Sequence, residues 1–186
     1  MINPINFINF LKINDINFFT GVPDSILKNF TNCLPKGQKH IVAVNEGSAV
    51  GLGIGQYLAT KKLPCIYMQN SGLGNAINPL ISVAHKSVYA IPMLLIIGWR
   101  GALGYRDEPQ HNTKGKISSK ILKLLNIRHL KVSKKANLKK IEELINYAKK
   151  HQQPVALLIK KDLFSNKKNY KSINKNKISR EKAIQE

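Results

Sequence analysis

Acidic residues are scarce in this sequence, with 10 Asp and Glu against 30 Lys and Arg and a formal net charge of +20 at pH 7. Such an excess of positive charge is typical of proteins that bind nucleic acid or an anionic membrane. The chain is, however, rich in Lys, Asn and Ile together, and its lysines gather from Lys114 onward. Because charge on helix faces and in tails is usually just solvated, we rank nucleic-acid binding well below a small-molecule role.

Cysteine is also scarce, and Cys33 and Cys65 form no CxxC pair and have no His at metal-ligand spacing. This argues against a disulfide framework or a metal site in this chain and favours a reduced protein. The N-terminus lacks the basic region and the cleavage site of a signal peptide. No apolar run approaches the length of a membrane span. We therefore expect a soluble, cytoplasmic protein.

Three glycine motifs of common α/β enzymes are missing. The glycines at 51–55 fall inside an expected helix, and Gly72-x-Gly74 is followed by Ile77 where G-x-G-x-x-G needs its third glycine. No GxxxxGK[ST] loop and no GxSxG elbow is present. A dinucleotide fold, a P-loop site and an α/β-hydrolase are thus unsupported.

What the sequence does contain is a regular alternation of helical and strand patterns over 186 residues, enough for one domain with a proper core. Helices are expected at about 4–14, 48–59, 75–84, 116–126 and 138–150, and a further one after Asp24 or Ser25, either of which can cap it. Strands are expected at 18–20, 41–44, 64–68, 92–97, 128–132 and 155–159. The alternation predicts an α/β domain with an open parallel sheet of about six strands over residues 1–164. Residues 165–186 are expected to form a basic tail or linker, with the first turn of an unfinished helix at 179–184.

Polar loops follow four of the predicted strands, at 21–25, 45–48, 69–75 and 98–111. Any one of them is ordinary turn chemistry, with Asn75 a common cap, but together they should form one crevice at the carboxyl edge of the sheet. Glu46 has two interpretations there. It either complements the dipole of the following helix or, if buried among its small and apolar neighbours, acts as a proton donor of adjustable strength. The residues alone leave the two evenly matched.

These loops carry strings that resemble phosphonopyruvate decarboxylases, which depend on thiamine diphosphate and are closely related to sulfopyruvate decarboxylases. The strings are Gly-Val-Pro-Asp-Ser at 21–25, Asn-Glu-Gly at 45–47, Tyr-Met-Gln-Asn-Ser-Gly-Leu-Gly-Asn at 67–75, Gly-Trp-Arg-Gly at 98–101 and Asp-Glu-Pro-Gln-His at 107–111. The resemblance runs from about residue 4 to 162 and implies the pyrimidine-binding domain of that family. The implied reaction converts 3-phosphonopyruvate to phosphonoacetaldehyde and carbon dioxide; the alternative is a sulfopyruvate decarboxylase alpha subunit.

The resemblance also implies site residues. Glu46 matches the glutamate that bonds the aminopyrimidine ring nitrogen of the cofactor. Asp24 and His111 match acid/base residues of related decarboxylases, although those enzymes often carry paired histidines where this chain has His111-Asn112. The cofactor-binding loop corresponds to Gln69, Asn70, Ser71 and Gly72.

A phosphonate or sulfonate beside a carboxylate calls for fixed cations. Arg100 and Arg106, in the loop at 98–111, are our candidates, since a guanidinium pairs two oxygens at once. Asp24 and Ser25 are expected to bind the substrate as well. Solvated loop charges are an equally good interpretation of the two arginines.

The second domain of the family carries a Gly-Asp-Gly motif that helps to bind Mg²⁺ and the diphosphate, and no Gly-Asp-Gly occurs in this chain. We therefore expect a complementary subunit or domain to hold the Mg²⁺, within a hetero- or homo-oligomer. The chain would be half of a split enzyme or the N-terminal piece of a longer one. A rival from another class is a truncated, non-catalytic interaction protein with a polyanion-binding basic surface.

Overall fold

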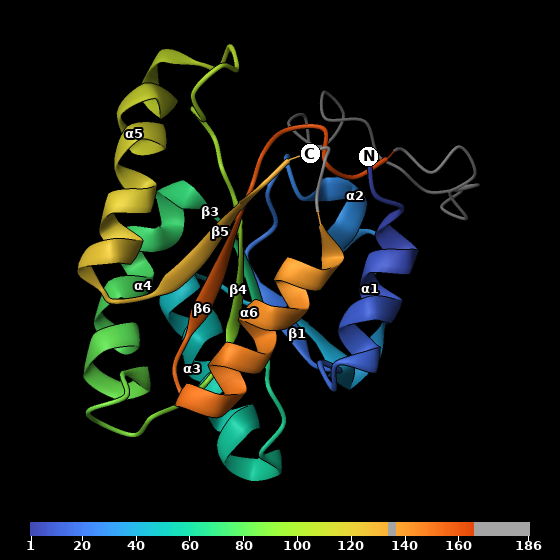
Figure 1. Ribbon diagram of the computed structural model, residues 1–186, viewed down its shortest axis with the longest axis vertical. Helices are drawn as coiled ribbons and strands as arrows, with labels where there is room; N and C mark the ends of the chain where they lie inside the picture. Colours follow the sequence, from blue (N-terminus) through green and yellow to red (C-terminus); the bar gives the residue numbers. More distant parts are fainter. Residues whose placement is uncertain (134–136, 166–186) are drawn as a thin grey trace, which may run out of the picture.

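A computed structural model describes residues 1–133 and 137–165 (Figure 1). Its centre is a six-stranded sheet in the order β2-β1-β3-β4-β6-β5, and every neighbouring pair is parallel. The strands are β1 (Phe19–Gly21), β2 (His40–Val42), β3 (Cys65–Gln69), β4 (Leu94–Gly98), β5 (Arg128–Val132) and β6 (Val155–Ile159). The predicted α/β domain with an open parallel sheet is confirmed. The predicted tail beyond Ser165 and the helix start at 179–184 lie outside the described residues.

Alternate residues of the central strands supply the two apolar cores. Tyr67, Ile96 and Leu157 point into one core, while Met68, Ile97 and Leu158 point into the other. Because both faces of β3, β4 and β6 are covered, these strands are apolar along their whole length, as parallel strands require. The sequence pattern of alternating apolar strands and amphipathic helices thus produces a three-layer domain.

The first core is covered by α1 (Pro4–Ile13), α2 (Lys28–Thr31) and α6 (Leu138–His151), and the second by α3 (Glu46–Thr60), α4 (Leu73–Pro79) and α5 (Pro109–Leu124). Figure 1 shows these two groups on opposite sides of the sheet. Shorter turns complete the chain: η1 (Gly37–Lys39), η2 (Asn70–Gly72) and the π-helical turn η3 (Leu80–Ala84). The turn η3 follows Pro79, which has no N–H to donate to the helix.

The start of α5 differs from its prediction. We expected the helix to begin at about residue 116, but it begins at Pro109 with Glu108 as its N-cap. A proline fits the first helical position because its nitrogen would have no partner there in any case. The consequence for the site is that His111 lies in the first turn of a helix and not in the preceding loop.

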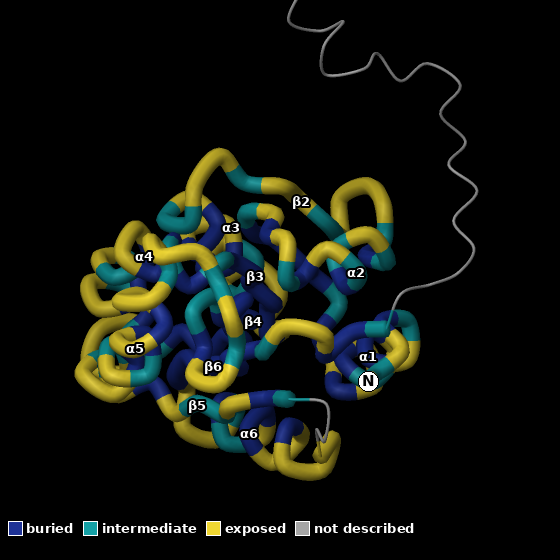
Figure 2. The backbone as a smooth tube through the Cα atoms, turned by 90° about the horizontal axis from the view of Figure 1, so that it is seen from above, coloured by how far each residue is buried: buried dark blue, intermediate teal, exposed yellow. Residues whose placement is uncertain are grey.

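The sheet order creates a switch point beside β1. From β1 the chain goes to β2 on one side, and it returns on the other side to form β3, so the loops after β1 and β3 begin as neighbours. Open α/β sheets bind ligands at this position. Strand β2 is the exposed edge, and Figure 2 shows it outside the buried central strands. Within residues 1–133 and 137–165, no helix is long and apolar enough to cross a membrane.

Candidate active site

Asp24 joins the loops after three strands. Its side chain is buried, and Oδ1 accepts a hydrogen bond from Gln69 Nε2 at 2.8 Å, at the end of β3. Oδ2 accepts from the backbone N–H groups of Ile26 and Leu27, so Asp24 also fixes the turn before α2. The prediction that Asp24 or Ser25 caps this helix is wrong, because α2 begins only at Lys28, with Leu27 as its N-cap and no side-chain cap hydrogen bond. A Cβ on Gly98 would lie 2.0 Å from Oδ2, which leaves room only for glycine at the end of β4. The carboxylate is therefore held from β1, β3 and β4 together.

Glu46 is the first residue of α3, but it does not cap that helix. The cap is Asn45, whose Oδ1 accepts from Ser48 N at 2.8 Å. The half-buried Glu46 carboxylate instead turns toward α4, where Asn75 Nδ2 donates to Oε2 at 2.8 Å. A Cβ on Gly72 would lie 2.0 Å from Oε1, so the glycine makes the space that this carboxylate occupies. No hydrogen bond from the described residues reaches Oε1, so this oxygen is oriented but has no hydrogen-bond partner among them.

The side chains of Gln69, Asn70 and Ser71 form hydrogen bonds within the domain. Ser71 Oγ donates to Gln69 Oε1 at 2.6 Å and so orients the amide that holds Asp24. Asn70 is buried; its Nδ2 donates to the carbonyl of Arg100 and to Ser118 Oγ, and its Oδ1 accepts from Arg100 N. Of the four residues predicted to bind the cofactor besides Glu46, only Gly72 packs on Glu46. Gln69 and Asn70 connect this loop to Asp24 and Arg100, and Ser71 orients Gln69.

Arg100 forms a paired charge with Asp107. Its Nε lies 2.8 Å from Oδ2, its Nη2 bonds Oδ1, and its Nη1 donates to Ser25 Oγ at 3.1 Å. The backbone N–H groups of Gly101 and Glu108 also donate to Asp107. The Arg100 guanidinium, helped by these amides, holds the pKa of Asp107 well below its usual range, against the effect of burial. This ion pair ties together the loop between β4 and α5.

The pair sets an expected pH dependence of stability. Asp107→Asn should lower the free energy of unfolding at pH 7 by about 1–3 kcal/mol, because Arg100 loses a charged partner. Since the Asp107 pKa is lower in the folded than in the unfolded chain, this contribution is complete above about pH 5 and declines as the pH falls below about 4. Urea unfolding at pH 7 and pH 3 measures it.

A matched control is Asp15→Asn, which removes an exposed carboxylate 3.6 Å from Lys149. It should change stability by less than about 0.5 kcal/mol at either pH. A destabilisation by Asp107→Asn that is equally large at pH 3 and pH 7 would contradict the assignment.

The other two predicted residues lie apart from these networks. His111 is half-buried in the first turn of α5, and its Nδ1 is buried with no hydrogen-bond partner among the described residues. Its backbone packs so tightly on Gly101 that a Cβ there would lie 2.0 Å from the His111 carbonyl oxygen. Arg106 is exposed. The structure therefore brings Asp24, Gln69 and Ser71 together, joins Ser25 to Arg100, and shows no hydrogen bond from His111 to Asp24 or Glu46 in the described chain.

Three partners of the site were not assigned from the sequence. Asn75 looked like an ordinary cap, although it closes the string at 67–75. Asp107 belongs to another of the quoted strings, but nothing in the spacing indicated that it neutralises Arg100. Ser118 lies on α5 with no sequence signal at all. No group of three His, Cys, Asp or Glu that could hold a metal ion occurs within the described part of the chain.

Known proteins resemble this chain in sequence. It is 39% identical over 106 residues to phosphonopyruvate decarboxylase of Streptomyces viridochromogenes, covering 56% of this chain and 26% of that protein. It is 36% identical over 156 residues to sulfopyruvate decarboxylase subunit alpha of Methanocaldococcus jannaschii, covering 81% of this chain and 88% of the subunit. The chain thus spans about a quarter of the phosphonopyruvate decarboxylases that it matches and most of the alpha subunits.

Solved structures resemble the fold. A thiamine diphosphate-dependent 4-hydroxybenzoylformate decarboxylase of Rhodococcus jostii superposes with a TM-score of 0.66 at 15% identity, covering 89% of this chain and 31% of that one. Benzoylformate decarboxylase of Polynucleobacter necessarius gives 0.64 at 17% identity, covering 96% and 33%. Residues 6–121 match the family model described as thiamine pyrophosphate enzyme, N-terminal TPP binding domain. The chain therefore belongs to the family of N-terminal TPP-binding domains of thiamine pyrophosphate enzymes.

Proposed function

We propose that this chain is the pyrimidine-binding half of a thiamine-diphosphate-dependent 2-oxo acid decarboxylase whose substrate carries a phosphonate or a sulfonate. The observation that carries the proposal is the Glu46 carboxylate, which Asn75 and Gly72 hold at the carboxyl edge of the sheet, with no hydrogen bond from the described residues to Oε1. The names of the relatives, phosphonopyruvate and sulfopyruvate decarboxylase, support the substrate class.

The hydrogen bonding of the Glu46 carboxylate fits the cofactor. An oriented carboxylate oxygen with no partner in the described chain suits a heteroaromatic ring nitrogen that shares a proton with it. Glu46 would hold that proton at Oε1 while Asn75 keeps Oε2 in place. Once bound, thiamine diphosphate supplies the electron sink for the bond to the departing carbon dioxide.

Loss of carbon dioxide leaves a carbon that must take up a proton, so the site needs an acid. We assign this proton transfer to Asp24 and His111. Asp24 is rigid, since Gln69 and two backbone amides fix both of its oxygens. His111 lies in the first turn of α5 and is only half-buried, so part of the residue is accessible to a ligand or a second chain.

A complementary domain or subunit would complete the site and hold Mg²⁺ and the diphosphate, in a hetero- or homo-oligomer. Support comes from the apolar segment directly before Glu46: Ile41, Val42 and Val44 are exposed, Val44 by 90%. Apolar side chains exposed together in this way are typical of surfaces that another chain covers. The relatives named as alpha subunits also point to a partner. We place the assembly in the cytoplasm, which the isolated cysteines of the sequence favour.

Our first candidate substrate is 3-phosphonopyruvate, which would yield phosphonoacetaldehyde and carbon dioxide. The second is sulfopyruvate, favoured by the match over 88% of an alpha subunit. The test is carbon dioxide release by this chain mixed with the complementary subunit, using each acid in turn. We expect release only with both chains and the cofactor present, and a higher kcat/KM for one acid. Turnover by the complementary chain alone, or none with either acid, would refute the proposal.

A further inference from the structure

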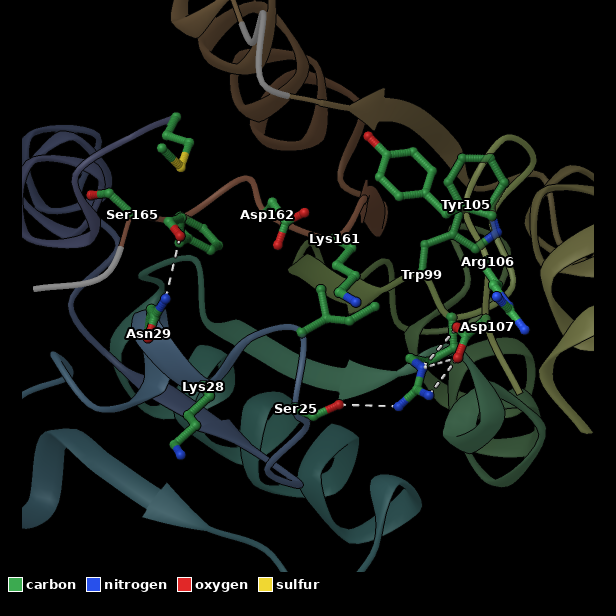
Figure 3. Close-up of a pocket in the computed structure, with 15 residues that line it drawn as sticks. Ser25, Lys28, Asn29, Trp99, Tyr105, Arg106, Asp107, Lys161, Asp162 and Ser165 are labelled. Carbon is green, nitrogen blue, oxygen red and sulfur yellow. Dashed lines mark hydrogen bonds and ion pairs between the residues drawn. The ribbon is translucent and has the colours of Figure 1, made fainter.

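A pocket of the described chain lies at the carboxyl ends of β4 and β6, next to the loop that carries Ser25. It measures about 770 Å³ and is lined by, among others, Ser25, Trp99, Arg100, Tyr105, Arg106 and Lys161 (Figure 3). This volume is within the range of small-molecule sites. Ser25, which follows Asp24 directly in the chain, lines this pocket, whereas the buried Asp24 is not among the lining residues.

The charges around this pocket are not balanced. Arg100 and Asp107 neutralise each other, and the low pKa of Asp107 keeps the pair intact at neutral pH. Three further cations line the pocket, Lys28, Arg106 and Lys161, against the single remaining carboxylate of Asp162. None of the three forms an ion pair with a described residue. The pocket therefore has an excess of positive charge that its own carboxylates do not cancel.

Lys161 is the cation best placed to meet a ligand. In Figure 3 it extends toward the middle of the pocket, whereas Arg106 lies at the rim beside Asp107 with its guanidinium turned outward and Lys28 points away. Arg106 is exposed, so its long side chain is free to turn toward a ligand beside Lys161. An ammonium and a guanidinium together can contact several oxygens of a tetrahedral oxyanion. Arg100 cannot serve in the same way, because Asp107 and Ser25 already occupy its guanidinium.

Trp99 and Tyr105 give the same pocket an aromatic lining. Trp99 is buried, and its Nε1 donates to the carbonyl of Gly115 at 2.8 Å, which fixes the ring. The Nζ atom of Lys160 lies 5.7 Å from the ring centre of Trp99 and 5.3 Å from the ring centre of Tyr105. The aromatic lining lowers the local dielectric and Lys160 adds positive potential, so an anion beside this lining is attracted more strongly than at an open surface.

We propose that this pocket is the subsite for the tetrahedral oxyanion of the substrate, phosphonate or sulfonate, with Lys161 and Arg106 as its ligands and Arg100 as a positioning residue. The proposal rests on the proposed function for the identity of the substrate, but the excess of charge and the aromatic lining are independent of it. It revises the sequence-based choice of Arg100 and Arg106 by replacing Arg100 with Lys161.

The kinetic test compares Lys161→Gln and Arg106→Gln with the parent chain in the reconstituted enzyme. The substrates are phosphonopyruvate, sulfopyruvate and pyruvate, which lacks the tetrahedral oxyanion. Each variant should lose about 10- to 100-fold in kcat/KM for the anionic substrate, as expected for a charged hydrogen bond, and keep its kcat/KM for pyruvate. The acid that suffers the larger loss is the natural source of the oxyanion. Lys120→Gln and Arg128→Gln, at exposed positions on α5 and β5, are the matched controls and should change neither value.

A binding test on the chain without its partner separates this proposal from the proposed function. Methylphosphonate and methanesulfonate, titrated in turn, should shift the NMR signals of the Trp99 indole N–H and of Ser25, and the double variant at Arg106 and Lys161 should abolish the shift. If the reconstituted enzyme released no carbon dioxide, the proposed function would fail while this titration still decided the subsite. Equal losses with pyruvate and with the anionic acids, or an unchanged titration in the double variant, would overturn the subsite.

Discussion

Replacing Glu46 by glutamine is expected to lower turnover by about 10²- to 10⁴-fold, the usual contribution of a positioned proton-transfer group. Glutamine keeps the shape of the side chain and can still accept the hydrogen bond from Asn75, so the surrounding structure is retained. It cannot share a proton at the position of Oε1. Because no hydrogen bond from the described residues reaches this oxygen, the free energy of unfolding should change by less than about 0.5 kcal/mol.

The measurement is carbon dioxide release by the reconstituted enzyme, with urea unfolding of the variant chain alongside. Glu142→Gln, on the exposed side of α6, removes the same charge far from the site and should leave turnover unchanged. Calorimetric titration with thiamine diphosphate, in the presence of the partner, should also show weaker binding by Glu46→Gln. Full turnover by this variant would instead support the rival interpretation of the chain as a non-catalytic interaction protein.

The fold was largely predictable because its strands are short apolar runs separated by helices with clear periodicity. What the sequence could not supply is the order of the strands, since a parallel sheet allows several crossovers for one order of elements along the chain. The position of β1 between β2 and β3 is what brings Gln69 to within 2.8 Å of Asp24. The start of α5 was missed because its first turn, Pro-Gln-His, is polar and shows no apolar periodicity.

The sequence predicted which residues form the site better than it predicted their hydrogen-bond and ion-pair partners. The family strings single out Glu46 and Asp24, and the structure holds both at the carboxyl edge of the sheet, each by hydrogen bonds. The ion pair could not be predicted in this way, because it depends on how the loop folds back on itself. Arg100 meets Asp107 seven positions along the chain through a segment that turns at Gly101 and Gly104, whose φ angles are +67° and +84°. Lys161 was overlooked for a similar reason: it reaches the pocket from β6, far along the chain from the strings.

Gly72→Ala is expected to reproduce much of the loss caused by Glu46→Gln, although it leaves the carboxylate in place. The backbone at Gly72 has φ −78° and ψ −8°, which alanine adopts without strain. The new Cβ would, however, lie 2.0 Å from Glu46 Oε1 and 2.2 Å from its Cδ, so the carboxylate must move. Turnover should fall by about 10²-fold because a misplaced proton-transfer group loses its hydrogen-bond geometry, and the chain should lose about 1–3 kcal/mol from overpacking.

Gly74→Ala is the matched control, because a Cβ there meets nothing within 4 Å; it should leave turnover and stability near their parent values. A double-mutant cycle then isolates the contact, since residues in direct contact give non-additive changes. In a Glu46→Ala background the obstructing side chain is absent, so adding Gly72→Ala should cost little or no stability. If the two changes were additive, the effect of Gly72→Ala would come from its backbone, and the close packing of Gly72 against Glu46 would not be what positions the carboxylate.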